Sequence, residues 1–135
     1  MNQHVKQLIF VYGTLRKDAN HPAHKIYLNK AVFVGYAKVR GELFMIDYYP
    51  GLVLNQTDAW VYGEVYELGD ASEWQRLDVY EACSTSCAEP HEYARRKCLV
   101  KFDDGIESYA WTYVYIQSLQ HFTKIASGDF IKLPL

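Results

Sequence analysis

Residues 8–16 read LIFVYGTLR, an apolar run that ends in a glycine-containing turn and a basic residue. Four consecutive apolar residues followed by a turn with Gly13 are typical of a short buried strand. The glycine indicates a strand end where the backbone takes unusual angles or approaches a ligand closely. Successive N–H groups in such a turn can form a nest for a carboxylate. An ordinary glycine turn explains the same residues, so this segment alone leaves the choice open.

The turn lacks the glycine spacing of two common nucleotide-binding loops. A dinucleotide-binding loop needs G-x-G-x-x-G and a P-loop needs G-x-x-x-x-G-K-[ST], and neither pattern occurs in the chain. The spacing therefore excludes both kinds of loop.

Most of the remaining chain has the pattern of strands. Residues 60–68 (WVYGEVYEL) are the clearest example, because Val61, Gly63 and Val65 alternate with a second set, Tyr62, Glu64 and Tyr66. This period of two is typical of a strand. Residues 93–102 and 108–116 also alternate, and they flank Asp103-Asp104-Gly105, a hairpin turn signal. Shorter strands are predicted at residues 8–11, 31–39, 41–46 and 52–54, with a bulge or close approach at Gly35.

Two segments change to helical spacing. Residues 70–80 place Trp74, Leu77 and Tyr80 on one face, and Asp70 or Ser72 can cap the first turn. Residues 20–29 form a shorter candidate helix with a proline near its start, where the missing N–H costs nothing. About six or seven strands with two short helices predict an α+β fold: a small mixed, mostly antiparallel β-sheet curled into a barrel and flanked by short α-helices.

Length and composition narrow the classes of protein. A chain of 135 residues is expected to form a single domain over residues 1–135, by the usual ~100–200 residues per domain. The net charge of −2 offers no basic surface for nucleic acid, and no apolar stretch approaches the ~20 residues of a membrane span. Without a visible signal peptide the expected location is the cytoplasm, where cysteines stay reduced.

The predicted helix at 70–80 is followed by Glu81. A carboxylate at this end is unfavourable, because the C-terminus of a helix already carries partial negative charge. Such a residue either lies on a solvated surface or serves chemistry that benefits from a raised pKa. Taken by itself, Glu81 is better explained as a residue on a solvated surface.

Seven short motifs follow one another along the chain in a specific order. They are FVYGTLR, YPGLV, VYGEVYEL, LDVYE, EYARR, AWTYVY and SGDF, which together extend from about Val11 to Phe130. In this order they resemble the gamma-glutamylcyclotransferase-like family, which includes the gamma-glutamylamine cyclotransferases and the AIG2-like proteins. The resemblance implies a small barrel flanked by helices, a substrate pocket beside the Y-G-T-L loop and one glutamate as general acid/base.

The resemblance also implies roles for individual residues. By its place in L-D-x-Y-E, Glu81 is the expected general acid/base. The backbone N–H groups of Gly13, Thr14 and Leu15 are expected to hold an anionic end of the substrate or a developing oxyanion. The expected substrate site further includes Tyr93 and Tyr115 as pocket walls and hydroxyl donors, and Tyr12, which serves packing more than chemistry.

The activity that follows from the resemblance is the release of 5-oxoproline from a gamma-glutamyl amine or peptide. The α-amine of the gamma-glutamyl unit attacks its own γ-carbonyl, so the enzyme mainly has to fold its substrate. No metal or cofactor is required, and the expected partner is a small gamma-glutamyl molecule. Two alternatives are a non-catalytic binding module of the same fold and a related gamma-glutamyl acyl-transfer enzyme in biosynthesis. Variable loops, such as residues 47–51 and the insert after Glu81, are expected to build the part of the pocket for the leaving amine, so the sequence leaves this amine undetermined. It also leaves the oligomeric state undetermined.

Residues 82–92 (ACSTSCAEPHE) depart from the family pattern, which has only a handful of residues between the glutamate and Y-x-R. The insert brings Glu89 and Glu92, so Glu92 is a second candidate for the working carboxylate. The insert also contains Cys83, Cys87 and His91, which together with Cys98 are potential zinc ligands. Their spacing, C-x3-C-x3-H-x6-C, is not a usual zinc pattern, so free thiols are expected.

Overall fold

The computed structural model describes residues 7–55, 57–81 and 91–132. The strands are β1 (Gln7–Val11), β2 (Val32–Met45), β3 (Pro50–Leu54), β4 (Trp60–Leu68), β5 (Tyr93–Phe102), β6 (Glu107–Tyr115) and β7 (Thr123–Lys124). The helices are α1 (Pro22–Tyr27) and α2 (Ala71–Tyr80), with short 3-10 turns η1 (Lys17–Ala19) and η2 (Phe130–Lys132). None of the helices in these described ranges is long and apolar enough to cross a membrane.

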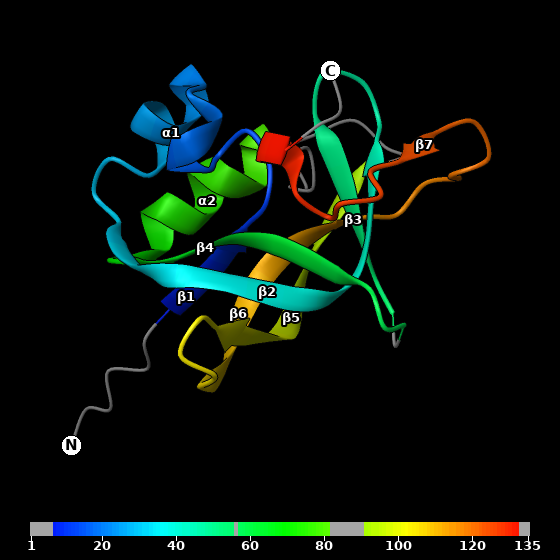
Figure 1. Cartoon of the computed structure of the whole chain (residues 1–135). Coiled ribbons are helices and arrows are strands. Elements are labelled where there is room, and N and C mark those ends of the chain that lie inside the picture. The colour runs from blue at the N-terminus through cyan, green and yellow to red at the C-terminus, as the bar shows by residue number, and fades with distance from the viewer. Residues whose placement is uncertain (1–6, 56, 82–90, 133–135) are drawn as a thin grey trace.

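The sheet closes on itself. Neighbouring strands follow the order β1-β4-β2-β3-β6, and a parallel pairing of β1 with β6 completes the ring. β5 forms an antiparallel hairpin with β6 and also pairs with β2, while α1 and α2 lie together at one side of the barrel (Figure 1). Most pairings are antiparallel, and those of β6 with β1 and β3 are parallel. The predicted α+β barrel with flanking helices is confirmed.

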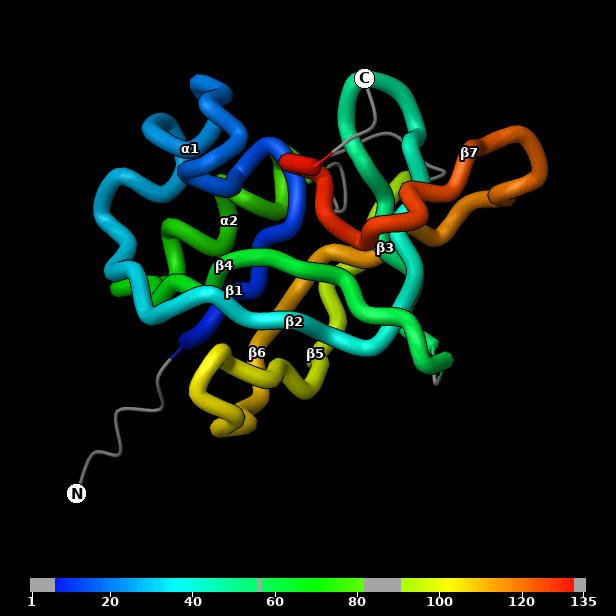
Figure 2. The backbone as a smooth tube through the Cα atoms, in the orientation of Figure 1, coloured from blue at the N-terminus to red at the C-terminus, as the bar shows by residue number. Residues whose placement is uncertain are grey.

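β2 differs from the prediction, which placed two separate strands at residues 31–39 and 41–46. It runs as one strand of 14 residues that bends around the barrel, as the backbone trace in Figure 2 shows. Gly41 does not end the strand, because its missing side chain lets β3 approach: a Cβ there would lie 2.5 Å from the carbonyl oxygen of Val53. The irregularity predicted at Gly35 is present as a register shift between Phe33 and Gly35 in the pairing with β4.

Both helices begin near their predicted starts. Asp70 caps α2 and, with Glu73, forms a reciprocal capping box that satisfies N–H groups at the helix start. Pro22 is the first residue of α1, which is shorter than the predicted segment 20–29. α2 buries Trp74 and Leu77 and ends at Glu81, its C-cap residue.

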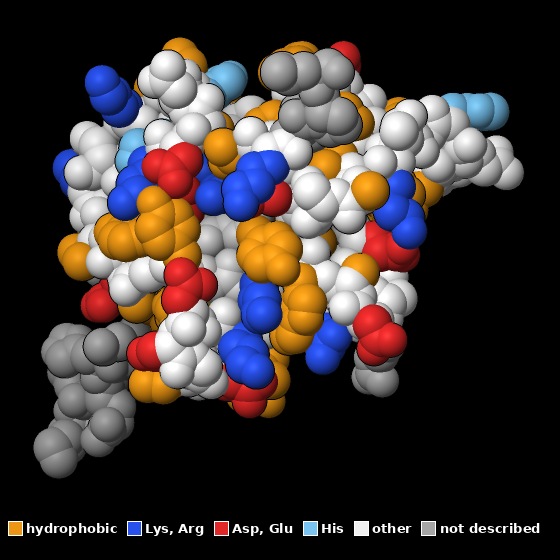
Figure 3. All heavy atoms as spheres, viewed as in Figure 1, with side chains coloured by type: hydrophobic (Ala, Val, Ile, Leu, Met, Phe, Trp, Pro, Cys, Tyr) orange, Lys and Arg blue, Asp and Glu red, His pale blue; other side chains and the backbone are white. Residues whose placement is uncertain are grey.

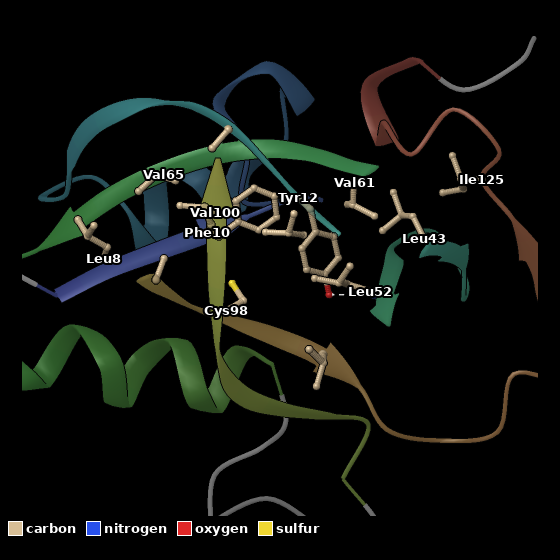
Figure 4. Close-up of a cluster of buried hydrophobic side chains, with 14 residues drawn as sticks. Leu8, Phe10, Tyr12, Leu43, Leu52, Val61, Val65, Cys98, Val100 and Ile125 are labelled. Carbon is tan, nitrogen blue, oxygen red and sulfur yellow. Dashed lines mark hydrogen bonds between the residues drawn. The ribbon is translucent and has the colours of Figure 1, made fainter. Parts of the chain in front are cut away.

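β1 is buried on both faces, which explains its uninterrupted apolar run. Leu8, Phe10 and Tyr12 point into the barrel, and Ile9 and Val11 join a second cluster that includes side chains of the helices. Figure 4 shows the interior cluster, which extends from Leu8 and Phe10 to Tyr12. Tyr12 lies beside three residues from other strands: Leu43, Leu52 and Val61.

The outer face carries aromatic rings that are covered by cations. The Lys17 ammonium lies 3.8 Å from the ring centroid of Phe33, and Lys38 and Arg40 lie 4.4 and 3.9 Å from that of Trp60. Figure 3 shows basic and hydrophobic side chains next to one another on this face. The long stems and charged heads of these residues cover part of the rings.

Candidate active site

A cavity of about 220 Å³ opens beside the turn that follows β1. Its walls come from β1 and this turn, the segment before β3, the end of α2, the start of β5, and β6. The lining residues are Phe10, Val11, Tyr12, Gly13, Thr14, Leu15, Tyr48, Tyr49, Pro50, Tyr80, Glu81, Glu92, Tyr93 and Tyr113. The fold therefore brings the Y-G-T-L turn and Glu81 to one cavity.

The turn at residues 13–15 presents free backbone donors. The N–H of Arg16 closes the turn on the carbonyl of Gly13 at 3.0 Å. Within the described part of the chain, the N–H groups of Gly13, Thr14 and Leu15 donate no hydrogen bond. Donors left unpaired beside a cavity are suited to an anionic group of a ligand.

Gly13 is required for a reason other than an unusual backbone angle. Its φ lies outside the left-handed region, unlike those of Gly105 and Gly128. The expectation of an unusual backbone angle at Gly13 is therefore wrong. A Cβ at residue 13 would instead lie 2.7 Å from Cγ and 2.8 Å from Cδ of Pro50. The missing side chain lets the turn pack directly against the start of β3.

Gly13→Ala should therefore overpack this contact. Overpacking usually costs about 1–3 kcal/mol of unfolding free energy, measurable by urea denaturation. Pro50→Ala removes the two opposing ring carbons, so the double variant should lose less than the sum of the single losses. Strictly additive losses would show that the Pro50 contact is not the reason for glycine at this position.

Behind the turn, Arg16 lies in a buried ionic cluster. Its Nε is 3.1 Å from Glu64 Oε2 and its Nη1 is 2.8 Å from Asp129 Oδ1. Glu64 has an exposed fraction of 0% and also accepts hydrogen bonds from the Lys17 N–H and the Tyr66 hydroxyl. This cluster joins the turn to β4 and to the segment before η2. Sequence reasoning missed it, although its ionic members stand in three of the seven motifs.

Glu81 combines burial with a charged neighbour. Its backbone N–H donates to the carbonyl of Leu77 at 2.9 Å, and its half-buried side chain lines the cavity. Removal of the carboxyl from water, and secondarily the negative charge of Glu92, raise its pKa to about 8. The carboxyl can therefore exchange a proton near neutral pH, which a solvated glutamate does poorly.

The tyrosines of the cavity are fixed by hydrogen bonds. The Tyr12 hydroxyl donates to the carbonyl of Tyr113 at 2.6 Å and accepts from the N–H of Leu52, which ties it into the core. The Tyr93 hydroxyl donates to the carbonyl of Pro50 at 2.7 Å. Burial raises the pKa of both Tyr12 and Tyr93 far above its usual value, so both hydroxyls stay neutral.

Tyr115 is not among the residues that line the cavity. Its ring packs edge-on against Tyr93, with 5.5 Å between the centroids, and against Phe122. Tyr48 and Tyr49 do line the cavity. They belong to the loop at residues 47–51 that was expected to build the leaving-amine part of the pocket, although neither tyrosine was named as a site residue. The motif YPGLV also begins at Tyr49.

The zinc hypothesis falls mostly outside the described residues, because Cys83 and Cys87 lie there. Cys98 is buried on β5 inside the barrel, and burial raises the pKa of its thiol to about 12. Within the described ranges, no group of three or more His, Cys, Asp or Glu could hold a metal ion.

The comparison with protein families decides the classification. The sequence pattern of the gamma-glutamyl cyclotransferase, AIG2-like family matches residues 9–132. The chain belongs to this family. The resemblance predicted from the seven motifs is thereby confirmed.

Relatives of the AIG2-like family member described here come from distant organisms. A Methanocaldococcus jannaschii protein, provisionally named a gamma-glutamylcyclotransferase, is 33% identical over 125 residues, covering 92% of this chain and 95% of the relative. The crystal structure of Bacillus subtilis YkqA aligns with a TM-score of 0.70 and 31% identity, over 93% of this chain and 40% of YkqA. The mouse AIG2-like protein structure aligns with a TM-score of 0.70 and 26% identity, over 97% of this chain and 86% of that one.

Proposed function

We propose that this protein is a cyclotransferase that releases 5-oxoproline from a gamma-glutamyl amine or gamma-glutamyl peptide. One observation carries the proposal: a carboxyl with a pKa of about 8, that of Glu81, shares a cavity with the unpaired N–H groups of the turn at residues 13–15. Membership of the gamma-glutamyl cyclotransferase, AIG2-like family supports the same chemistry.

In the proposed reaction the α-amine of the gamma-glutamyl unit attacks the γ-carbonyl carbon of the same molecule. Glu81 takes a proton from the α-ammonium, and the free amine then forms the new C–N bond of the five-membered ring. The ring nitrogen loses its second proton, the bond to the leaving nitrogen breaks, and Glu81 passes both protons to that nitrogen in turn. The products are 5-oxoproline and the leaving amine as its ammonium ion, so no proton is consumed or released overall.

The turn at residues 13–15 has the complementary role. A carboxylate of the substrate, or the negative charge that develops on the γ-carbonyl oxygen, meets backbone donors rather than another anion. Tyr93 forms a neutral wall of the cavity, and its hydroxyl is already bound to a backbone carbonyl. Tyr12 and Tyr115 support this wall by packing.

Glu81 is favoured over Glu92 as the working carboxylate. Glu92 lines the same cavity, but one of its carboxylate oxygens already accepts a hydrogen bond from the Tyr49 hydroxyl at 2.6 Å. The negative charge of Glu92 in turn raises the pKa of Glu81. We therefore assign proton transfer to Glu81 and a supporting role to Glu92.

The pH dependence of 5-oxoproline formation tests this assignment. The rate constant kcat/KM should rise with pH and level off near the Glu81 pKa of about 8, because the base must be ionised in the free enzyme. Glu92→Gln removes the nearby negative charge, so this rising limb should move to lower pH. A rising limb at the same pH in wild-type and Glu92→Gln protein would contradict the proposed coupling. If no gamma-glutamyl amine or peptide yields 5-oxoproline, the binding-module alternative stands instead.

A further inference from the structure

The cavity is one-sided in its charge. Its described walls contain two carboxylates, Glu81 and Glu92, and no Lys, Arg or His. A leaving amine with its own carboxylate would meet these acidic groups with no basic side chain beside it. Charge alone therefore disfavours anionic leaving groups here.

The cavity has a buried part and an exposed mouth. Tyr12, Leu15 and Tyr93 form its buried part, with exposed fractions of 7%, 4% and 4%. Tyr48 marks the mouth, since it is 70% exposed and packs edge-on against Tyr49 at 5.1 Å between centroids. Glu92 is joined to this mouth by its hydrogen bond with Tyr49.

Among the residues that the structure describes, Glu92 has an orienting partner but no counter-ion. The Tyr49 hydroxyl fixes one carboxylate oxygen, and Glu92 forms no ion pair with any residue in the described part of the chain. The neighbouring rings of Tyr48 and Tyr49 present faces that also attract cations. A carboxylate and two tyrosines at the mouth of a cavity are suited to an alkylammonium group.

We propose that Glu92, with Tyr48 and Tyr49, selects leaving amines that carry a second positive charge, such as the far ammonium of an alkyl diamine. This inference rests on the proposed function, because it assumes that the gamma-glutamyl unit occupies the buried part of the cavity. It makes Glu92 a specificity residue, in addition to its effect on the Glu81 pKa.

Three ligands of equal length test the proposal: the gamma-glutamyl amides of 1,5-diaminopentane, of pentylamine and of 5-aminopentanoate, which end in a cation, a methyl group and an anion. Calorimetry at pH 7 with the Glu81→Gln variant measures binding without turnover. The cationic amide should bind about 10-fold more tightly than the neutral one, and the anionic amide more weakly still. In Glu81→Gln/Glu92→Gln the three affinities should converge.

The matched control is Glu81→Gln/Glu107→Gln, which removes the charge of an exposed glutamate that does not line this cavity. It should keep the ranking of the three amides. An equal loss of affinity for all three on Glu92→Gln would mean that Glu92 binds the α-ammonium they share, and would overturn the proposal. So would a ranking that survives Glu92→Gln.

Two further measurements separate this inference from the proposed function. Thermal shifts of wild-type protein with 1,5-diaminopentane and with pentylamine give the comparison without any change at Glu81; equal shifts would count against the ammonium site. Turnover of the three amides by wild-type protein reports on 5-oxoproline formation. Ranked binding without turnover would retain the ammonium site and reject the cyclotransferase.

Discussion

Glu81→Gln is expected to slow 5-oxoproline formation by about 100- to 10,000-fold, the usual contribution of general acid–base catalysis. Glutamine keeps the shape and the hydrogen-bonding reach of the side chain but cannot accept the proton of the α-ammonium. The loss should therefore appear in kcat, while the affinity for a gamma-glutamyl amide persists. Single-turnover measurement of 5-oxoproline, with calorimetry for binding, separates the two quantities.

The same variant has a stability signature. The Glu81 pKa rises from an ordinary 4.5 to about 8 on folding, so between these pH values the native state binds more protons than the unfolded state. The stability of the wild-type protein should therefore fall as pH rises through this window. Glu81→Gln lacks this fall, so its free energy of unfolding relative to wild type should be higher at pH 8.5 than at pH 4.5. Urea denaturation at the two pH values checks this.

Glu92→Gln serves as the comparison. It should reduce turnover much less than Glu81→Gln, because Glu92 influences proton transfer only through the Glu81 pKa. If Glu92→Gln abolished 5-oxoproline formation and Glu81→Gln left it intact, the catalytic carboxylate would be Glu92. The insert at residues 82–92 would then have relocated the chemistry.

Arg16→Met is expected to reduce the free energy of unfolding by about 3–5 kcal/mol, the typical cost of breaking a buried ion pair. Methionine fills part of the volume but leaves Glu64, which is fully buried, without its cation. Asp129 loses the same partner. Urea denaturation with a constant slope measures the loss.

A companion variant shows whether charge is the cause. In Arg16→Met/Glu64→Gln the orphaned charge is gone, so the double variant should be more stable than Arg16→Met alone. A loss that is unchanged by Glu64→Gln would assign Arg16 a packing role only.

Much of the fold could be predicted from local pattern. Period-two alternation located β4 and the β5–β6 hairpin, and helical spacing with a capping aspartate located α2. These signals are local because side-chain periodicity and caps depend on residues only a few positions apart. The prediction of β2 as two strands was wrong, because the local pattern does not show that the strand continues through Arg40 and Gly41, where the missing side chain of Gly41 lets β3 approach.

The candidate site divides in a similar way. The ordered motifs pointed to the Y-G-T-L turn, Glu81 and Tyr93, and the structure brings all of these to one cavity. Their roles remain predictions. The loop at residues 47–51 was expected at the pocket, but Tyr48 and Tyr49 were not singled out within it, since tyrosines are frequent throughout this chain and nothing local marks the ones that face a cavity.

The sequence by itself determined the α+β class, most of the strands, the helix that ends at Glu81 and the order of motifs that indicated the gamma-glutamyl cyclotransferase, AIG2-like family. Only the tertiary structure decided which of these residues meet. Arg16 pairs with Glu64, 48 positions away, and with Asp129, 113 positions away, because the closed ring brings the turn after β1 beside β4 and the C-terminal segment. The Glu81 pKa also depends on burial and on Glu92, and both depend on how the barrel closes.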